Sequence, residues 1–269
     1  MFQSYYGMSC DPFSKEMNID HPYESDDFKE VLNRFKYLVE IKGIGLFIGE
    51  AGFGKTFSLR SFATSLNPDL YKVIYVSATK NMTTFDFFKE IGDVFNIDTG
   101  ACYKMDLYHK IQKEMILLVE KEKKIPIIMI DDAHNLSKEI LLNLKVLYEF
   151  EMDSKDYVTL LLVGKKELKM ELSKGMYDYL KQRILVNYKL EGLNRQDIKE
   201  YVKTRLQLAN VNHDLFSEDA LNALYSCSHS SFRRLNTLIL NCLLLGYQKK
   251  KETIDSEIVR VAKGEIDLE

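Results

Sequence analysis

Short apolar runs alternate with amphipathic stretches over the first 190 residues of the chain. The apolar runs are five to seven residues long and rich in β-branched side chains, which is typical of buried strands. Between them, apolar residues recur at every third or fourth position, which is the spacing of an amphipathic helix. The pattern predicts strands at residues 44–48, 71–77, 125–130, 157–163 and 184–190, and helices at residues 26–40, 57–66, 84–95, 104–123, 137–150, 166–172 and 176–181.

The pattern changes after residue 192, where helical stripes continue and no further strand is predicted. The stripes predict helices at residues 194–210, 217–227, 232–249 and 255–264. Strands that alternate with helices favour a parallel sheet, and the helices that follow favour a separate helical lid. We therefore predict three parts, which are an N-terminal arm at residues 1–25, an α/β domain with a five-stranded parallel sheet at residues 26–190, and a helical lid at residues 191–269.

The first predicted strand runs directly into Gly-Glu-Ala-Gly-Phe-Gly-Lys-Thr at residues 49–56. This sequence has the spacing G-x-x-x-x-G-K-[ST] of a phosphate-binding loop, with the strand before it and the helix after it that such a loop requires. Glycines let backbone N–H groups point at one phosphate chain, and the following helix directs its positive end toward the same phosphates. Lys55 is expected to reach the β- and γ-phosphates, and the Thr56 hydroxyl is expected to ligate Mg²⁺. The alternative, a chance glycine turn, is disfavoured by the flanking elements.

Two acids, Asp131 and Asp132, end the strand predicted at residues 125–130. An acid at the tip of a buried strand can hold Mg²⁺ together with Thr56, and we assign this role to Asp131. The adjacent acid can orient and polarise an attacking water molecule, so Asp132 is the candidate base. The alternative is that both acids only end a strand at a solvated loop, and the phosphate loop disfavours it.

Four further residues are weaker candidates. Lys165 follows the fourth strand and would lie between the two motifs, although an ordinary surface lysine fits about as well. Arg183 precedes the last strand and Arg233 begins a lid helix, and either guanidinium could bind phosphate oxygens, in its own chain or in a neighbouring subunit. His134 could respond to the nucleotide or assist Asp132, and a packed or capping histidine is the simpler interpretation.

Composition limits the remaining possibilities. A net charge of −3 does not indicate a global basic field for nucleic acid, although it leaves room for a local one. The four cysteines are far apart and lack a C-x-x-C pair, which argues against a zinc site and suits a reducing compartment. The sequence has neither an apolar run of membrane-spanning length nor a signal peptide, so we expect a cytoplasmic protein without a membrane partner.

Candidate contacts to DNA are Lys80 and Thr83, in the loop after the second strand, and Lys104. Lysines and short polar side chains can contact phosphates without recognising base sequence. An ordinary polar loop is the alternative, because neither a basic nor an aromatic cluster accompanies these residues.

Six segments together resemble a known family. They are Tyr-Gly-Met with Asp-Pro-Phe (6–8 and 11–13), the phosphate loop (49–56), Ile-Asp-Asp-Ala-His-Asn-Leu (130–136), Leu-Val-Gly-Lys-Lys-Glu-Leu (162–168), Gln-Arg-Ile (182–184) and Phe-Arg-Arg-Leu-Asn (232–236). In this order they resemble the AAA+ ATPases of the ExeA/TniB/TnsC group over almost the whole chain. The group includes secretion-assembly ATPases and transposon target-DNA regulators akin to the phage Mu B protein.

The resemblance implies a P-loop NTPase (AAA+) three-layer fold and a role for each matching position. Lys165 falls at sensor 1, Arg183 near the arginine finger and Arg233 at sensor 2, and Asp131 is the Walker B magnesium acid. ATP with Mg²⁺ is the implied cofactor, bound between subunits of a ring or filament. The residues assigned to the nucleotide are Gly49, Glu50, Ala51, Gly52, Phe53, Gly54, Lys55, Thr56, Phe57 and Arg233.

The sequence departs from the family's pattern in three motifs. The second Walker B acid is usually Glu, and the shorter Asp132 retracts the carboxylate, so we expect slow hydrolysis suited to a switch. Sensor 1 is commonly Gln or Asn rather than Lys165. The sensor 2 segment usually carries Gly and Pro where this chain has Ser230 and Phe232.

The resemblance leads to three functional hypotheses. Secretion-type members carry a membrane segment and a peptidoglycan-binding module beyond the ATPase, which are missing from these 269 residues. We therefore expect an ATP-dependent regulator of transposition that binds duplex DNA with little sequence preference and recruits a transposase. The alternatives are a secretion-type assembly ATPase that acts on protein partners, and a nucleotide-switched scaffold with negligible turnover.

Overall fold

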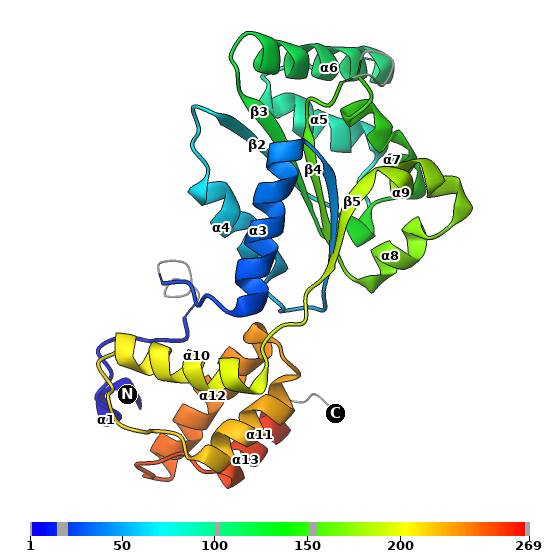
Figure 1. The fold of residues 1–269 in the computed structure, drawn as a ribbon. Coiled ribbons are helices and arrows are strands. Elements are labelled where there is room, and N and C mark those ends of the chain that lie inside the picture. Colours follow the sequence, from blue (N-terminus) through cyan, green and yellow to red (C-terminus); the bar gives the residue numbers. More distant parts are fainter. Residues whose placement is uncertain (1, 15–20, 100–102, 151–154, 267–269) are drawn as a thin grey trace. The chain divides into compact units, whose positions relative to one another are not determined.

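Five parallel strands form the centre of the α/β part of the chain. The computed structural model describes residues 2–14, 21–99, 103–150 and 155–266 (Figure 1). The strands are hydrogen-bonded in the order β2-β3-β4-β1-β5, so β4 lies between the strands that carry the two motifs. Their bounds are β1 Ile44–Ile48, β2 Tyr71–Ser77, β3 Ile125–Asp131, β4 Thr159–Gly164 and β5 Ile184–Lys189. All pairs are parallel, which brings the carboxyl ends of the strands to one edge of the sheet.

Helices cover both faces of this sheet, because successive residues of its buried strands alternate between two apolar surfaces (Figure 1). On one face, the ring of Phe47, from β1, packs edge-on against Phe35 with centroids 4.6 Å apart, and Phe35 in turn lies tilted against Phe62 at 5.3 Å. The other face forms one core with the second group of helices. The helices are α3 Asp26–Ile41 and α4 Lys55–Ser65 on the first face, and α5 Thr84–Val94, α6 Lys104–Glu120 and α7 Lys138–Asn143 on the second. After them come α8 Lys166–Leu172 and α9 Asp178–Arg183.

The helix predicted at residues 137–150 is wrong in its second half. The α-helix α7 ends at Asn143 and continues only as a 3₁₀ turn at Leu144–Leu147. The side chain of Gln112, from α6, donates hydrogen bonds of 3.0 and 3.2 Å to the carbonyls of Val146 and Glu149. These contacts give the segment an alternative to helical hydrogen bonding that the local apolar spacing does not reveal.

The chain divides by its contacts into two compact units. Unit 1 consists of Met1–Lys29, Ala51–Gly54 and Glu191–Glu269, and unit 2 consists of Glu30–Glu50 and Lys55–Leu190. The helices after residue 191 are α10 Arg195–Leu208, α11 Glu218–Ser228, α12 Phe232–Gln248 and α13 Ser256–Ile266. Within the predicted N-terminal arm, the chain forms a short helix, α1 Phe2–Tyr5.

The N-terminal residues contribute to the core of unit 1. Tyr6, Met8 and Phe13 are buried in the same apolar cluster as the lid helices. The Tyr6 hydroxyl donates a 3.3 Å hydrogen bond to the carbonyl of Lys251. A Cβ at Gly246 would lie 2.4 Å from the Tyr6 hydroxyl oxygen, so the close packing of the arm needs a glycine on α12. Across the described residues, we find no helix that combines the length and apolar character needed to cross a membrane.

Candidate functional site

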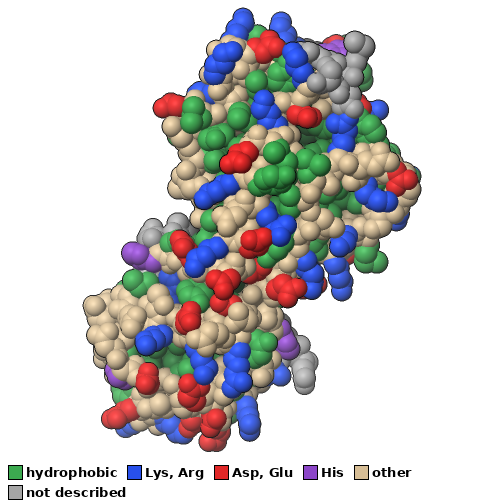
Figure 2. Space-filling view, in the orientation of Figure 1, with side chains coloured by type: hydrophobic (Ala, Val, Ile, Leu, Met, Phe, Trp, Pro, Cys, Tyr) green, Lys and Arg blue, Asp and Glu red, His purple; other side chains and the backbone are tan. Residues whose placement is uncertain are grey.

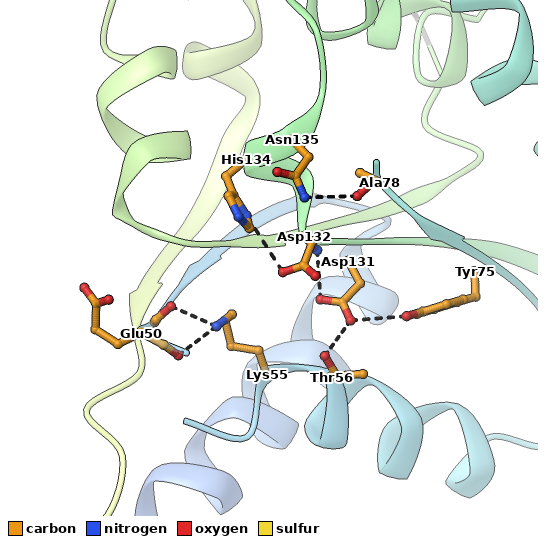
Figure 3. A network of polar contacts seen from close by, with 10 residues as sticks. Glu50, Lys55, Thr56, Tyr75, Ala78, Asp131, Asp132, His134 and Asn135 are labelled. Atoms are coloured by element: carbon orange, nitrogen blue, oxygen red, sulfur yellow. Dashed lines mark hydrogen bonds and ion pairs between the residues drawn. The ribbon is translucent and has the colours of Figure 1, made fainter. Parts of the chain in front are cut away.

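The buried end of β3 carries the first acid of the predicted pair. Asp131 is only 2% exposed, and its carboxylate accepts three hydrogen bonds (Figure 3). They come from the Thr56 hydroxyl at 2.6 Å, the Tyr75 hydroxyl at 3.2 Å and the Asp132 backbone N–H at 2.9 Å. The structure therefore brings together the two residues that we predict to hold Mg²⁺, at the carboxyl edge of the sheet.

The oxygens of Thr56 and Asp131 fit a magnesium ion chemically. Mg²⁺ prefers hard oxygen ligands and is usually held by one or two protein groups together with substrate phosphates. A hydroxyl and a carboxylate oxygen 2.6 Å apart supply such a pair. The metal assignment of both residues remains a prediction, supported by this donor set.

Tyr75 is a member of the site that the sequence pattern did not predict. It lies on β2, two residues before Ser77, which pairs in register with Asp131. Burial, together with the Asp131 charge, raises the pKa of the Tyr75 hydroxyl, so the phenol stays protonated and donates. The sequence held part of the information needed to predict this contact. Residues two apart on a strand share a face, so Tyr75 shares the face of Ser77, the residue paired with Asp131.

Lys55 begins α4 and is 8% exposed. Its ammonium donates hydrogen bonds of 2.9 and 2.8 Å to the carbonyls of Gly49 and Glu50, at the start of its own loop (Figure 3). Burial lowers the pKa of Lys55, while the charges of Asp132 and Asp131 act in the opposite direction. The lysine thus lies beside both acids, held by carbonyls that an anionic ligand could replace.

Asp132 differs from its neighbour in backbone and in exposure. Its φ and ψ of 49° and 34° are left-handed, a conformation that Asp and Asn adopt more readily than other non-glycine residues. The side chain is 48% exposed, and its Oδ1 lies 3.8 Å from Nδ1 of His134. The following turn is anchored by Asn135, whose side-chain amide donates a 3.1 Å hydrogen bond to the carbonyl of Ala78. The turn therefore brings the half-exposed Asp132 carboxylate beside the ring of His134.

Lys165 directly follows β4, between the strands that lead to the phosphate loop and the acid pair. Its backbone is extended and it begins α8 as the N-cap residue. Its positive charge contributes to lowering the pKa of both Lys55 and His134, which places it in the electrostatic neighbourhood of the cluster. The sensor role of Lys165 remains a prediction with this geometry in its favour.

Arg183 is the last residue of α9. Its guanidinium carbon lies 5.2 Å from the ring centroid of Tyr148 and 5.1 Å from that of Tyr179, distances at which a cation and an aromatic face attract each other. The two tyrosines therefore position the arginine on an aromatic surface. Its role as an arginine finger remains a prediction.

Residues 51–54 of the phosphate loop group with the start of α12 in unit 1. The backbone N–H of Phe232 donates a 3.0 Å hydrogen bond to the carbonyl of Gly52, and the Ser231 hydroxyl donates one of 3.3 Å to the carbonyl of Ala51. A proline at position 232, where the family pattern has one, could not donate this bond. Arg233 is exposed beside this contact, since a Cβ at Gly52 would lie 3.2 Å from its Cβ.

The three residues assigned to DNA have different surroundings. Thr83 caps α5 in a reciprocal capping box with Asp86, and Lys104 forms an ion pair with Glu139. Lys80 is exposed in the loop after β2. On the face drawn in Figure 2, basic and acidic side chains are interspersed. Contact of these residues with DNA remains a prediction.

Comparison with known proteins supports the fold independently and identifies proteins that this chain resembles. Residues 39–172 match a family model described as an AAA domain. The chain is 27% identical to the general secretion pathway protein A of Aeromonas hydrophila over 267 residues, which is 99% of this chain and 48% of that protein. The chain thus spans about half the length of the curated relative it matches.

Solved structures share the fold at low sequence identity. The Cdc6 protein of Pyrobaculum aerophilum superposes with a TM-score of 0.72 at 16% identity, over 96% of this chain and 71% of that chain. The Orc1 protein of Aeropyrum pernix, solved in complex with DNA, superposes with a TM-score of 0.66 at 19% identity, over 95% of this chain and 68% of that chain. The predicted fold class, a P-loop NTPase fold with a central five-stranded parallel sheet followed by helices, is confirmed.

Proposed function

We propose that this chain, which has the fold and the AAA domain of an AAA+ ATPase of the ExeA type, binds ATP with Mg²⁺ and hydrolyses it slowly as a molecular switch. One observation carries the proposal. The Thr56 hydroxyl lies 2.6 Å from the buried Asp131 carboxylate, directly beside a buried lysine that follows a glycine-rich loop. This arrangement suits a magnesium-bound triphosphate better than it suits a structural ion pair, because the three donors to Asp131 are uncharged and leave its negative charge available to a cation.

The phosphates would be held by groups that now have weaker partners. Lys55 would exchange the carbonyls of Gly49 and Glu50 for β- and γ-phosphate oxygens, which are stronger acceptors. Helix α4 begins at Lys55 and directs its positive end toward the same phosphates. Mg²⁺, held by Thr56 and Asp131, would neutralise the charge that develops on the phosphate oxygens.

Hydrolysis requires a base for the attacking water, and Asp132 is the candidate. The water oxygen forms a bond to the γ-phosphorus, its proton moves to the Asp132 carboxylate, and ADP leaves with the bridging oxygen. The short carboxylate at a left-handed backbone position limits how closely it approaches the phosphate, which is the physical reason to expect slow turnover.

Two measurements test the nucleotide proposal. We expect calorimetry to detect ATP binding that needs Mg²⁺, and we expect phosphate release that stops when EDTA removes the metal. The same protein with Lys55→Ala serves as the inactive control. An absence of ATP binding at millimolar nucleotide in the unmodified protein would rule the proposal out.

For the partner of this switch, the relative in the secretion pathway favours assembly on proteins. Its similarity extends over 99% of the chain, which is more specific than a shared fold. In this proposal, ATP bound between copies of the chain stabilises a ring or filament that engages protein partners. Lys165, Arg183 and Arg233 would complete the nucleotide site, with Arg183 acting from the neighbouring subunit.

The second candidate, DNA binding in transposition, is supported by the Orc1 structure solved with DNA. In this case the filament binds duplex DNA through Lys80, Thr83 and Lys104 and recruits a transposase. Fluorescence anisotropy with duplex DNA, with and without a non-hydrolysable ATP analogue, separates the two candidates. ATP-dependent binding that weakens with salt supports DNA. Analogue-dependent assembly without DNA affinity at low salt supports protein partners.

A charge-reversal pair sharpens this experiment. Lys80→Glu removes the exposed lysine of the loop after β2, whereas Lys249→Glu changes an exposed lysine at the end of α12. DNA binding through the predicted loop requires the first substitution to weaken affinity and the second to leave it unchanged. Equal effects of both would indicate only a general charge attraction.

A further inference from the structure

His134 has an imidazole nitrogen that lacks a hydrogen-bond partner. The side chain is only 12% exposed, and among the described residues its Nδ1 is one of the few buried side-chain polar atoms without a partner. Buried polar atoms are normally satisfied, so an orphaned one indicates a functional role or a partner that arrives later. This nitrogen faces the carboxylate of Asp132 across 3.8 Å, which is too long for a hydrogen bond (Figure 3).

Two features of the backbone place the His134 ring beside Asp132. Asp132 is left-handed and the 3₁₀ turn Ala133–Asn135 follows it, so the chain reverses toward its own carboxylate. On the other side, a Cβ at Gly164 would lie 3.2 Å from the His134 backbone nitrogen and 3.5 Å from Nδ1. A glycine at the end of β4 thus leaves space for the turn and its imidazole.

Burial favours the neutral form of the ring, and the charges around it act in both directions. Burial lowers the pKa of His134, Asp132 and Glu167 oppose this effect, and Lys165 and Lys55 add to it. A neutral imidazole carries one N–H, and the tautomer with the proton on Nδ1 can donate to the carboxylate. Among the described residues, no other hydrogen bond or ion pair fixes the rotamer of the half-exposed Asp132 side chain.

We propose that His134 is a positioning residue for Asp132. When ATP is bound, Nδ1–H of His134 closes the gap and donates to Oδ1 of Asp132, which fixes the short carboxylate toward the attacking water. Catalytic hydrogen bonds are often long in the ligand-free protein and shorten in the bound state. This role rests on the proposed ATPase function and assigns to His134 a part in it that neither the fold nor the phosphate-loop motif specifies.

Three substitutions of one residue test the geometry. His134→Asn places an amide nitrogen near the position of Nδ1, His134→Gln places it near Nε2, and His134→Leu removes the donor at similar volume. We expect kcat to fall about 10- to 100-fold in the Leu and Gln variants and much less in Asn, because a misplaced group loses its orientation. KM and the affinity for a non-hydrolysable analogue should change much less than kcat.

A double-mutant cycle identifies the partner. In an Asp132→Asn background, which keeps the left-handed preference and removes the charge, His134→Leu should have no further effect on kcat. The proposal is overturned if His134→Leu matches the unmodified protein, if it lowers kcat equally in both backgrounds, or if His134→Asn is as slow as Leu with the same melting temperature.

A spectroscopic measurement separates this proposal from the hydrolysis proposal. In the protein with ¹⁵N-labelled histidine, adding Mg²⁺ and the non-hydrolysable analogue should shift the His134 nitrogen signals toward a neutral, Nδ1-protonated and hydrogen-bonded ring. Asp132→Asn should prevent the shift. If the shift occurs without turnover, hydrolysis is the proposal that fails. If the analogue binds and the ring signals stay unchanged, the His134 proposal fails.

Discussion

The end of β3 in unit 2 and the start of α12 in unit 1 both contact the phosphate loop or its flanks, but they do so by different means. At β3, the contacts centre on one charged side chain, the Asp131 carboxylate, which accepts from the hydroxyls of Thr56 and Tyr75 and from the backbone N–H of Asp132. At α12, backbone groups and one serine make them, through the carbonyls of residues 51 and 52.

The difference shows which groups can act chemically. The β3 end concentrates ionisable groups in a buried place, where electrostatic interactions are strong. The α12 start holds the tip of the loop by shape and by backbone hydrogen bonds. We therefore expect side-chain substitutions at the β3 end to act first on turnover, and substitutions where α12 meets the loop to act first on stability.

The largest effect should come from Lys55→Ala. It removes the cation that the structure holds beside both acids, so we expect a loss of at least about 100-fold in kcat/KM, comparable to losing a main electrostatic group of an active site. ATP-dependent assembly should disappear as well. Phosphate-release kinetics and light scattering measure the two effects. Because Lys55 burial is destabilising, the unfolding midpoint should not fall. A large fall in stability would show that the residue is mainly structural.

The next effect concerns the loop tip. Gly52 has a φ of +83°, and a Cβ there would lie 2.1 Å from the Ser231 hydroxyl oxygen. We expect Gly52→Ala to lower the free energy of unfolding by about 1–2 kcal/mol from backbone strain, and by more where Ser231 must move. Urea unfolding measures it.

Gly264→Ala is the matched control for that substitution. Gly264 lies on α13 in unit 1 with nothing within 4 Å of an added Cβ. Alanine there should raise helix stability by about 0.5–1 kcal/mol. Similar behaviour of the two variants would contradict the close approach of α12 to the loop.

Asp132→Glu tests whether the short carboxylate at the β3 end limits turnover. The longer carboxylate should raise kcat several-fold, since it approaches the attacking water more closely. The left-handed backbone works against this gain, and should reduce stability by up to about 1–2 kcal/mol because Glu tolerates it less well than Asp. Steady-state kinetics and urea unfolding report the two effects separately. Unchanged or reduced turnover at full occupancy with ATP would show that the length of this carboxylate does not limit hydrolysis.

Arg233 and Arg234 are adjacent on α12, and we expect substitutions of them to have smaller effects than those above. Arg233 is exposed, whereas Nε of Arg234 donates a 2.9 Å hydrogen bond to the carbonyl of Cys227. We expect Arg233→Ala to weaken ATP affinity, and Arg234→Ala to lower stability by about 1 kcal/mol through the lost hydrogen bond. Nucleotide titration and thermal unfolding of both variants compare them. If Arg234→Ala weakens ATP affinity and Arg233→Ala does not, the sensor assignment belongs to the second arginine.

The smallest effect is a pH dependence of stability. Burial lowers the pKa of His134 in the folded chain, so the unfolded chain binds more protons below its ordinary pKa of about 6.5. Stability from this residue is complete above that value and declines as the pH falls through it toward the lower folded pKa. Urea unfolding between about pH 7.5 and about pH 5.5 should show a shallower decline in His134→Asn than in the unmodified protein. An identical pH dependence in both would contradict the burial of a neutral ring.

Much of the α/β part was predictable because local signals agree with the tertiary fold. Buried apolar runs predicted the strand ends at residues 48 and 131 to within one residue, and these ends place Lys55, Thr56 and Asp131 at one edge of the sheet. The end of α7 was not predictable, because the Gln112 side chain that competes for its carbonyls comes from another helix. Tyr75 and the tyrosine contacts of Arg183 were missed for the same reason.

The sequence alone determined which chemistry is available. A glycine-rich loop ending in Lys55 and Thr56, and a buried strand ending in two acids, are local patterns whose physical meaning does not depend on distant contacts. Only the tertiary structure decided how the two acids differ. One accepts hydrogen bonds from three donors, and the other lies on a left-handed turn, 3.8 Å from a His134 nitrogen that has no hydrogen-bond partner among the described residues. Hydrogen-bond satisfaction and burial depend on chain segments that are remote in sequence, and side-chain identity alone does not specify them.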